Sequence, residues 1–301
     1  DLTNKTAIVK TVDKGISKKR APLLFNLAEL QAECSKRFKI SPDETLQVAQ
    51  DLYERKLTTY PRTDARVLSS AVAKEISKNI RGLRSFEPVA PFVQNIVEHG
   101  LYKNIGKSSY TDDSKITDHY AIVPTGQVNE YKSLTELQKR VYELIVRRFL
   151  SIFYPPAQYQ TVKLTIGIEK ESFFAGAKVL KVPGYLEIAG RPDIKEKREK
   201  EDGDGEENNP KNSAALLKLA DSLKEGDTAE VKEFLVKEGK TSPPKRYTSG
   251  SMVLAMENAG QLIEEEELRE QIKGSGIGTS ATRAAVSYTH LRAHETEADL
   301  V

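Results

Sequence analysis

A tyrosine and an arginine stand two residues apart in the segment LTTYPRTDAR, residues 57–66. Because Tyr60 precedes a proline, its backbone is pushed out of the helical region into an extended one. Residues two apart in an extended chain face the same side, so the phenol of Tyr60 and the guanidinium of Arg62 are expected side by side. This pair suits attack on a phosphodiester, with the phenol oxygen as nucleophile and the arginine stabilising charge on the phosphate oxygens. The alternative is a turn in which Tyr60 is packed and Arg62 is paired with Asp64.

A second candidate group lies in SKITDHYAIVPTG, residues 114–126, where Lys115, Asp118 and His119 precede a short apolar run. Beside phosphate chemistry, a histidine can hydrogen-bond a phosphate oxygen or transfer a proton. The alternative is a structural histidine whose hydrogen bonds are satisfied within the fold.

A third group, Lys245, Arg246 and Tyr247, stands directly before a predicted helix that starts near Ser249 or Ser251. Two cations and an aromatic ring suit a single-stranded nucleic-acid backbone with stacked bases. A solvated basic loop is the alternative interpretation.

The fourth group is KGSGIGTSATR, residues 273–283, in which three glycines precede Thr279 and Ser280, both good helix N-caps. A glycine loop that leads into a helix N-terminus is an anion site, and DNA phosphates are the anions we expect there. The glycine spacing excludes a dinucleotide fingerprint, and no Gly-Lys-Ser/Thr follows as in a P-loop. A tight turn between two helices is the alternative.

The bulk composition leaves the ligand open. The 301 residues predict roughly two domains of about 150 residues, and the net charge of +2, from 46 basic and 44 acidic residues, argues neither for nor against nucleic acid. The single cysteine, Cys34, excludes an internal disulfide and a cysteine-based zinc site, and we expect it in the core. No apolar run approaches the ~18 residues of a membrane span and no signal peptide is recognised, so we expect a cytoplasmic protein.

Helices are predicted around the tyrosine segment by their start signals. The clearest covers residues 41–56, with Ser41 as N-cap, Pro42 at the first position and Glu44 at the third. Others are predicted over 26–38 and 133–154, each from a capping box (Asn26 with Glu29, Ser133 with Glu136), and over about 70–81.

The next part of the chain predicts strands. YQTVKLTIGI, residues 159–168, alternates apolar and polar residues with the period of a strand. The same character is expected at the start of the chain and in ESFFAGAKVL, GYLEI and DTAEVKEFLV. Residues 191–212 are charged and are typical of a disordered insertion or linker. Two more helical segments are expected after Lys240.

Taken together and in this order, LYERKLTTYPRTDAR, KITDHYAIVPTG, PPKRYTSGSMVLAMENAG and GSGIGTSATRA closely resemble type IA DNA topoisomerases, best the bacterial topoisomerase III branch. The resemblance implies that Tyr60 attacks one DNA strand and holds its 5′ end as a phosphotyrosine. It implies that Arg62 supports cleavage and that His119, in an HxAI segment, contacts the scissile region. Tyr120 stands where this branch often has a second histidine, so no role is carried over to it. The candidate DNA-binding residues are Lys115, Asp118, Lys245, Arg246, Tyr247, Gly276, Thr279 and Arg283.

The fold that the resemblance implies is a mixed α+β, multidomain, toroidal core. Residues 1–21 would end a preceding arch or base segment, 22–156 form a helical gate domain with the tyrosine, 157–239 a β-rich arch, and 240–285 part of a helical base that grips single-stranded DNA. Residues 286–301 are predicted to be a non-native tail, because VSYTHLRAHET back-translates readily to an adaptor of transposon-based sequencing libraries.

The family also carries an N-terminal metal-binding domain whose acidic cluster holds Mg²⁺. No D-x-D with a partner glutamate occurs in residues 1–180, so we expect a fragment whose Mg²⁺ ligands lie outside this chain. The expected function is ATP-independent relaxation or decatenation of DNA by a monomeric enzyme, with this fragment inactive by itself. Two alternatives remain open: a single-stranded-DNA-binding module, and a tyrosine recombinase-type enzyme linked to a 3′ end.

Overall fold

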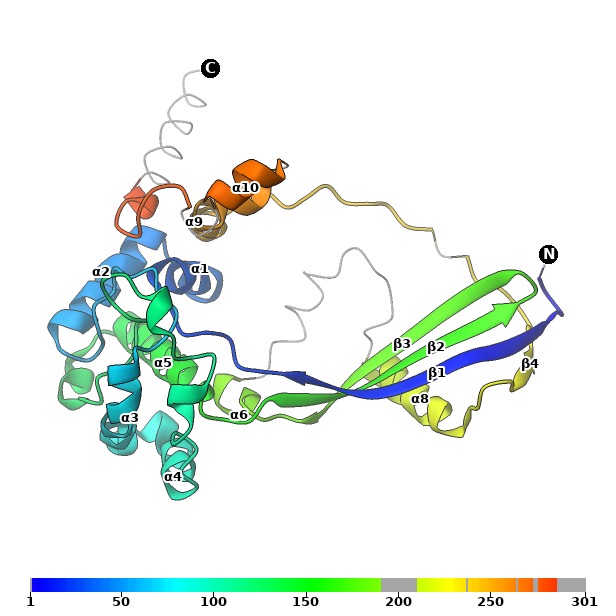
Figure 1. The fold of residues 1–301 in the computed structure, drawn as a ribbon, viewed down its shortest axis with the longest axis horizontal. Helices are drawn as coiled ribbons and strands as arrows, with labels where there is room; N and C mark the ends of the chain where they lie inside the picture. Colours follow the sequence, from blue (N-terminus) through cyan, green and yellow to red (C-terminus); the bar gives the residue numbers. More distant parts are fainter. Residues whose placement is uncertain (1, 191–209, 237, 264, 273–275, 286–301) are drawn as a thin grey trace, which may run out of the picture. The chain divides into compact units, whose positions relative to one another are not determined.

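The computed structural model describes residues 2–190, 210–236, 238–263, 265–272 and 276–285 (Figure 1). The chain divides into two compact units. The sheet unit comprises residues 1–21 and 155–244, and the helical unit comprises 22–154 and 245–301. Most of the predicted insertion at 191–212, and the whole predicted tail at 286–301, fall outside the described residues; residues 210–212 begin a helix.

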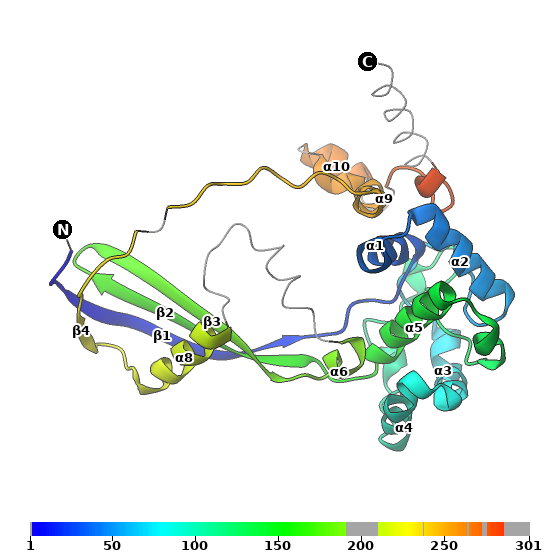
Figure 2. The ribbon, with the colours of Figure 1, turned by 180° about the vertical axis from the view of Figure 1, so that it is seen from behind.

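The sheet unit is built on four antiparallel strands in the order β3-β2-β1-β4. Figures 1 and 2 show the three long strands running side by side as a twisted ribbon. The register of β1 on β2 pairs Ala7 with Ile168 and Lys19 with Ala157, with one bulge between Val9 and Thr11. The strands are β1 Thr6–Lys19, β2 Ala157–Ile168, β3 Glu171–Val182 and β4 Thr228–Glu230.

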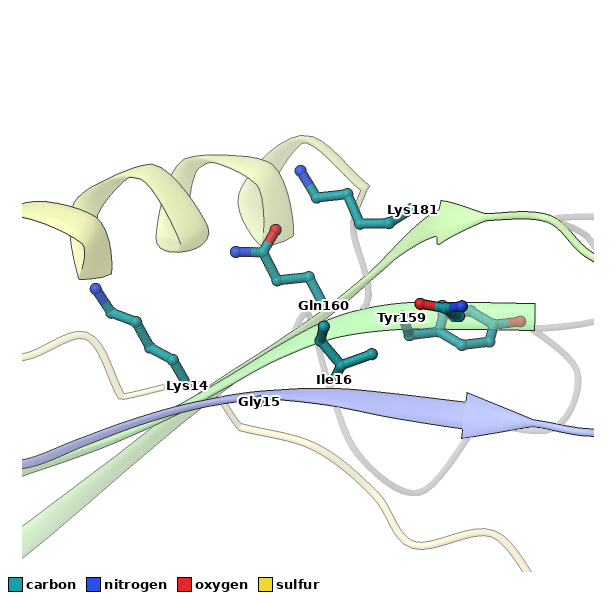
Figure 3. Close-up of a pocket in the computed structure, with 7 residues that line it drawn as sticks. Lys14, Gly15, Ile16, Tyr159, Gln160 and Lys181 are labelled. Carbon is teal, nitrogen blue, oxygen red and sulfur yellow. The ribbon is translucent and has the colours of Figure 1, made fainter. Parts of the chain in front are cut away.

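Helix α8, Pro210–Ser222, packs on β2 and β3. It forms a small apolar core with the sheet, made by Val162, Ala177, Leu217 and Ala220. A pocket of about 310 Å³ on the same sheet is lined by Lys14, Ile16, Tyr159, Lys181 and their neighbours (Figure 3). None of the predicted site residues lines it.

Two strand predictions in this unit are wrong. GYLEI contains a helical turn, α6 Leu186–Ala189, because Gly184 (φ +52°) turns the chain against the backbone of Pro155 and Pro156. DTAEVKEFLV is a strand only over β4, and residues 231–236 of this segment have no regular structure.

The helical unit carries the candidate site. Its helix α1 packs against α9, which comes more than 200 residues later in the chain. The α-helices are α1 Leu27–Phe38, α2 Pro42–Glu54, α3 Ser70–Gly82, α4 Ala90–Glu98, α5 Glu136–Ser151, α9 Ser249–Glu257 and α10 Glu266–Ile272. Short 3₁₀ helices cover Leu83–Ser85, Glu87–Val89, Ile105–Lys107, Asp113–Lys115, Asn129–Ser133 and Ala259–Leu262.

The helix starts follow local capping chemistry, with two corrections. The box predicted at α1 is only half formed, because the Asn26 side chain accepts the Glu29 amide while the Glu29 carboxylate pairs with Arg66. The Ser41 hydroxyl accepts the Glu44 amide and begins α2 as predicted.

The box of α5 is Thr135 with Gln138, two residues after the predicted pair, and both of its hydrogen bonds form. Two box patterns overlap in SLTELQ: Ser133 with Glu136, and Thr135 with Gln138. The second one forms, and it leaves Gln138 enclosed against α2, where its side chain donates to Asp51 at 3.0 Å.

Buried aromatic and aliphatic residues fill the helical unit, among them Phe25, Tyr142 and Phe149. The guanidinium carbon of Arg148 lies 4.0 Å from the centre of the Phe25 ring, and its Nη1 donates to the Leu23 carbonyl. These contacts fix residues 22–26, on which the tyrosine segment rests.

Candidate active site

The tyrosine segment is held along one side by the strand-like run that follows His119. The Thr59 amide donates to the Val123 carbonyl at 3.0 Å, and the Thr125 amide donates to Leu57 at 3.0 Å. An isolated antiparallel bridge pairs Thr58 with Pro124 between these bonds. Two motifs about sixty residues apart are thereby joined through their backbones.

On its other side the segment rests on the residues that lead into α1. The Leu27 amide donates to the Thr63 carbonyl at 3.1 Å, and the Leu24 amide donates to Arg66 at 3.2 Å. Thr63 is buried, and its hydroxyl donates to the His119 carbonyl at 2.7 Å. The segment is therefore a fixed element of the fold rather than a loose loop.

Tyr60 and His119 are brought into direct contact. Their ring centres lie 4.5 Å apart with the planes tilted by 48°, and the Tyr53 ring meets Tyr60 edge-on at 5.4 Å. Tyr60 is half-buried, whereas His119 is exposed. The phenol is held by its ring, and neither its oxygen nor the imidazole is hydrogen-bonded to a side chain within the described part of the chain.

Arg62 is exposed at the tip of a three-residue turn. The Thr63 amide donates to the Pro61 carbonyl at 3.0 Å, which closes a turn centred on Arg62 and departs from the fully extended chain that was expected. Arg62 makes no hydrogen bond or ion pair with the residues that the structure describes. The alternative in which Arg62 pairs with Asp64 is not the arrangement found, because Asp64 pairs with Arg283.

Arg283 is buried, with 4% of its side chain exposed. Its Nε donates to the Ile277 carbonyl at 3.0 Å, its Nη2 to Gly278 at 3.1 Å and its Nη1 to Asp64 Oδ1 at 2.9 Å. The prediction that Arg283 binds DNA does not fit this enclosure, since its guanidinium is already directed at three protein oxygens.

A second polar link was missed from the sequence. The Asn26 side-chain amide donates to Glu257 Oε1 at 2.6 Å and to the Asp64 carbonyl at 3.1 Å, while its oxygen caps α1 through the Glu29 amide. Burial raises the pKa of Glu257, and nearby Arg283 and Asn26 oppose the rise. Asn26 and Glu257 are more than 200 residues apart, so no local pattern could pair them.

The remaining candidates after the tyrosine segment are exposed. Lys115 ends the turn Asp113–Lys115 and pairs with Asp112 at 2.8 Å, which together with a bond from Ser114 lowers the pKa of Asp112 to about 2. Asp118 is exposed. Tyr120 is half-buried, and burial raises its pKa.

The basic triplet also lies on the surface. Lys245, Arg246 and Tyr247 are exposed, and Thr248 caps α9 immediately after them. Their side chains are presented as a nucleic-acid contact would require, and a solvated basic loop would look the same.

The glycine loop packs on the end of α9. A Cβ at Gly276 (φ +58°) would stand 2.6 Å from the Glu257 carbonyl oxygen, and the Ile277 amide donates to Met256 at 2.7 Å. The Thr279 amide donates a hydrogen bond to the Thr282 hydroxyl. A turn follows, and residues 283–285 are helical. The glycine at 276 is required by this close approach, which favours the tight-turn interpretation over an anion site.

No cluster of three or more histidine, cysteine, aspartate or glutamate side chains suited to a metal is found among the described residues. No step below is routed through a metal. The same residues include no helix that is long and apolar enough to cross a membrane.

Comparison with known proteins identifies the family. The profile described as DNA topoisomerase matches residues 1–292. The chain belongs to the type IA family of DNA topoisomerases. It is 34% identical over 290 residues to DNA topoisomerase 3 of Bacillus subtilis and 35% identical over 289 residues to that of Bacillus licheniformis. Each alignment covers 95% of this chain and 37% of the relative, so the chain spans little more than a third of these topoisomerases.

A solved topoisomerase has the same fold. The structure of full-length topoisomerase I from Thermotoga maritima matches with a TM-score of 0.58 and 22% identity, over 95% of this chain and 40% of that one. The mixed α+β core expected from the resemblance to type IA topoisomerases is thus confirmed. The profile match also reaches into the first residues of the segment predicted to be a non-native tail.

Proposed function

We propose that the full-length protein carrying this chain is an ATP-independent DNA topoisomerase that cleaves and reseals one DNA strand through Tyr60. The observation that carries the proposal is the packing of the Tyr60 and His119 rings at 4.5 Å, with an exposed Arg62 two residues after the tyrosine in the chain. Family membership supports the same activity. Strand passage through the transient break would relax or decatenate DNA.

The chemistry is an exchange of one phosphodiester for another. The Tyr60 oxygen bonds to the phosphorus, the bond from phosphorus to the 3′ oxygen breaks, and the proton lost by the phenol is balanced by one gained at the leaving 3′ oxygen. The DNA 5′ end is left on the protein. Because the new bond is a phosphodiester too, reversal reseals the strand without ATP.

Arg62 and His119 have separate roles in this step. The Arg62 guanidinium stabilises negative charge on the nonbridging phosphate oxygens, a contribution of roughly 3 kcal/mol for one well-placed donor. The contact between Tyr60 and His119 is made by their rings, so we assign His119 a hydrogen bond to a phosphate oxygen rather than removal of the phenol proton.

DNA would be held mainly as single-stranded segments. Arg246 and Tyr247 are exposed ahead of α9 and suit a backbone phosphate and a stacked base. Lys115 and Asp118 are exposed and precede His119 by four residues and one residue. We further propose a monomeric, cytoplasmic bacterial enzyme, and Mg²⁺ ligands in a part of the full-length protein outside this chain.

A second function is favoured for the chain by itself. The exposed basic triplet suits a single-stranded-DNA-binding module. A recombinase-type enzyme linked to a 3′ end is not favoured by the family match.

The test is covalent trapping with end-labelled oligonucleotides. The full-length protein is mixed with single-stranded DNA labelled at its 3′ or 5′ end and quenched in detergent. We expect labelled protein only from the 3′ label, and none from Tyr60→Phe. Tyr53→Phe is the matched control, since it keeps the edge contact of 5.4 Å and should still form the adduct. An adduct in Tyr60→Phe, or one formed from the 5′ label, would overturn the proposal.

A further inference from the structure

The buried guanidinium of Arg283 joins two segments that are far apart in the chain. Among the described residues it donates to the Ile277 and Gly278 carbonyls, which belong to the glycine loop, and to the Asp64 carboxylate. Glu257 Oε1 lies 3.9 Å from the same Nη1 that binds Asp64. Asp64 follows Tyr60 by four residues and Arg62 by two. The contact therefore ends on the segment that carries the candidate nucleophile.

The Asp64 region is fixed from several directions at once. The Asn26 amide binds the Asp64 carbonyl, and the Leu27 amide binds the Thr63 carbonyl. The Asp64 side chain itself is about half exposed, so only its pairing with Arg283 ties that carboxylate to the described part of the fold. Loss of the Asp64–Arg283 pair would make the backbone around Asp64, next to Arg62 in the chain, more mobile.

We propose that Arg283 is a positioning residue for the strand-cleavage reaction, which acts through Asp64 to hold Arg62 and Tyr60 where a phosphate can meet both. The inference rests on the proposed function. The glycine loop has a structural role in this arrangement, because it presents the two carbonyls that aim the Arg283 guanidinium at Asp64.

The geometry separates this role from a direct DNA contact. Three of the donor directions of the Arg283 guanidinium are taken by protein oxygens, and its side chain is 4% exposed. A lysine cannot replace it, because one ammonium on a flexible stem lacks the planar fork that reaches two carbonyls and a carboxylate together.

The experiment measures cleavage and DNA binding separately in the full-length protein. Arg283→Lys, Asp64→Asn and the double variant are compared in single-turnover adduct formation and in equilibrium binding of the same oligonucleotide. We expect each single variant to slow adduct formation about tenfold to a hundredfold, since misplacing a reacting group by ~1 Å can cost about 10². The dissociation constant should stay within about twofold of wild type, and the double variant should be no slower than the slower single variant.

The matched control is Arg66→Lys, in the same segment. Arg66 pairs with Glu29 at 2.6 Å and donates to Leu24, and it makes no contact with the glycine loop among the described residues. It should form the adduct at close to the wild-type rate. Equal slowing in Arg66→Lys, additive effects of Arg283→Lys and Asp64→Asn, or weaker DNA binding at an unchanged cleavage rate would each overturn the inference.

Hydrogen exchange tests the same link without catalysis. In Arg283→Lys the amides of Thr63 and Ala65 should exchange about tenfold faster, while that of Thr59, bonded to Val123, should not change. Unchanged exchange at Thr63 and Ala65 would overturn the positioning role. If the wild-type protein forms no adduct, the proposed function fails instead, and the exchange result still decides whether Arg283 holds the segment.

Discussion

Gly82, the last residue of α3, is expected to accept no side chain. A Cβ built there would stand 2.7 Å from the carbonyl carbon of Gly126 and closer still to its oxygen. Gly126 (φ +91°) follows the run that holds the tyrosine segment, and the Asn79 side chain donates to Pro124 beside it at 2.9 Å. Gly82→Ala therefore forces two backbones apart next to the site.

The size of the effect follows from two opposed contributions. Overpacking costs typically about 1–3 kcal/mol, and backbone atoms cannot move aside as a flexible side chain can. Alanine recovers part of this through its helix propensity, up to about 1 kcal/mol in a helix interior and less at a helix end such as Gly82. The net loss is about 1–2 kcal/mol, which for a unit of this size lowers Tm by about 2–8 °C.

Differential scanning calorimetry of the wild-type protein and two variants makes the comparison. The matched control is Gly106→Ala, where the nearest atom to a new Cβ is the Cβ of Ala73 at 4.0 Å. That variant should be unchanged or more stable by about 0.4–1 kcal/mol, because alanine reduces the entropy of the unfolded chain. A Gly82→Ala protein as stable as wild type, or an equal loss in Gly106→Ala, would refute the close-approach argument.

Three further predictions concern buried polar groups of the helical unit. Burial raises the pKa of Glu257, so its contribution to stability is present below the unfolded value of about 4.3 and is lost as pH rises through the folded value. Glu257→Gln should flatten the stability–pH curve over the range in which Glu257 loses its proton in the folded protein. An unchanged slope would contradict the prediction. Burial raises the pKa of Cys34 to about 12, so iodoacetamide at pH 8 should label it only after unfolding in guanidinium; rapid labelling of the folded protein would exclude this environment. Thr63→Val removes the hydroxyl that donates to His119 and accepts the Ala65 amide, so urea unfolding should show a loss of about 1–3 kcal/mol, and a neutral result would mean that these bonds add nothing net.

Local patterns were sufficient wherever one element's own residues decide its start. Ser41, Pro42 and Glu44 set the start of α2 because all the capping atoms lie within one turn. The start of α5 was misplaced by two residues since Ser133 and Thr135 offer competing boxes, and the choice depends on whether Gln138 meets α2. GYLEI was misread because its conformation depends on Gly184 meeting Pro155 and Pro156, a contact outside the segment.

The candidate site divides in the same way. The family resemblance implied that His119 contacts the scissile region, but the ring contact of Tyr60 with His119 was not predicted, since no periodicity links residues about sixty apart. The pairing of Asp64 with Arg283, across 219 residues, was beyond any local signal. Long-range pairing of polar groups depends on which backbones the fold brings together, and composition does not record this.

The pairing of β1 with β2 also has a consequence for the order in which the sheet forms during synthesis. Strand β1 is translated before its partner β2, which follows only after residues 22–154. At about 5–20 residues per second, β1 waits on the order of ten seconds for β2 to be synthesised. Lysines at positions 5, 10, 14, 18 and 19 of this region supply the charge that keeps a waiting strand from pairing with another chain. Replacing these lysines with uncharged residues would therefore promote aggregation during synthesis more than it would lower the stability of the folded protein.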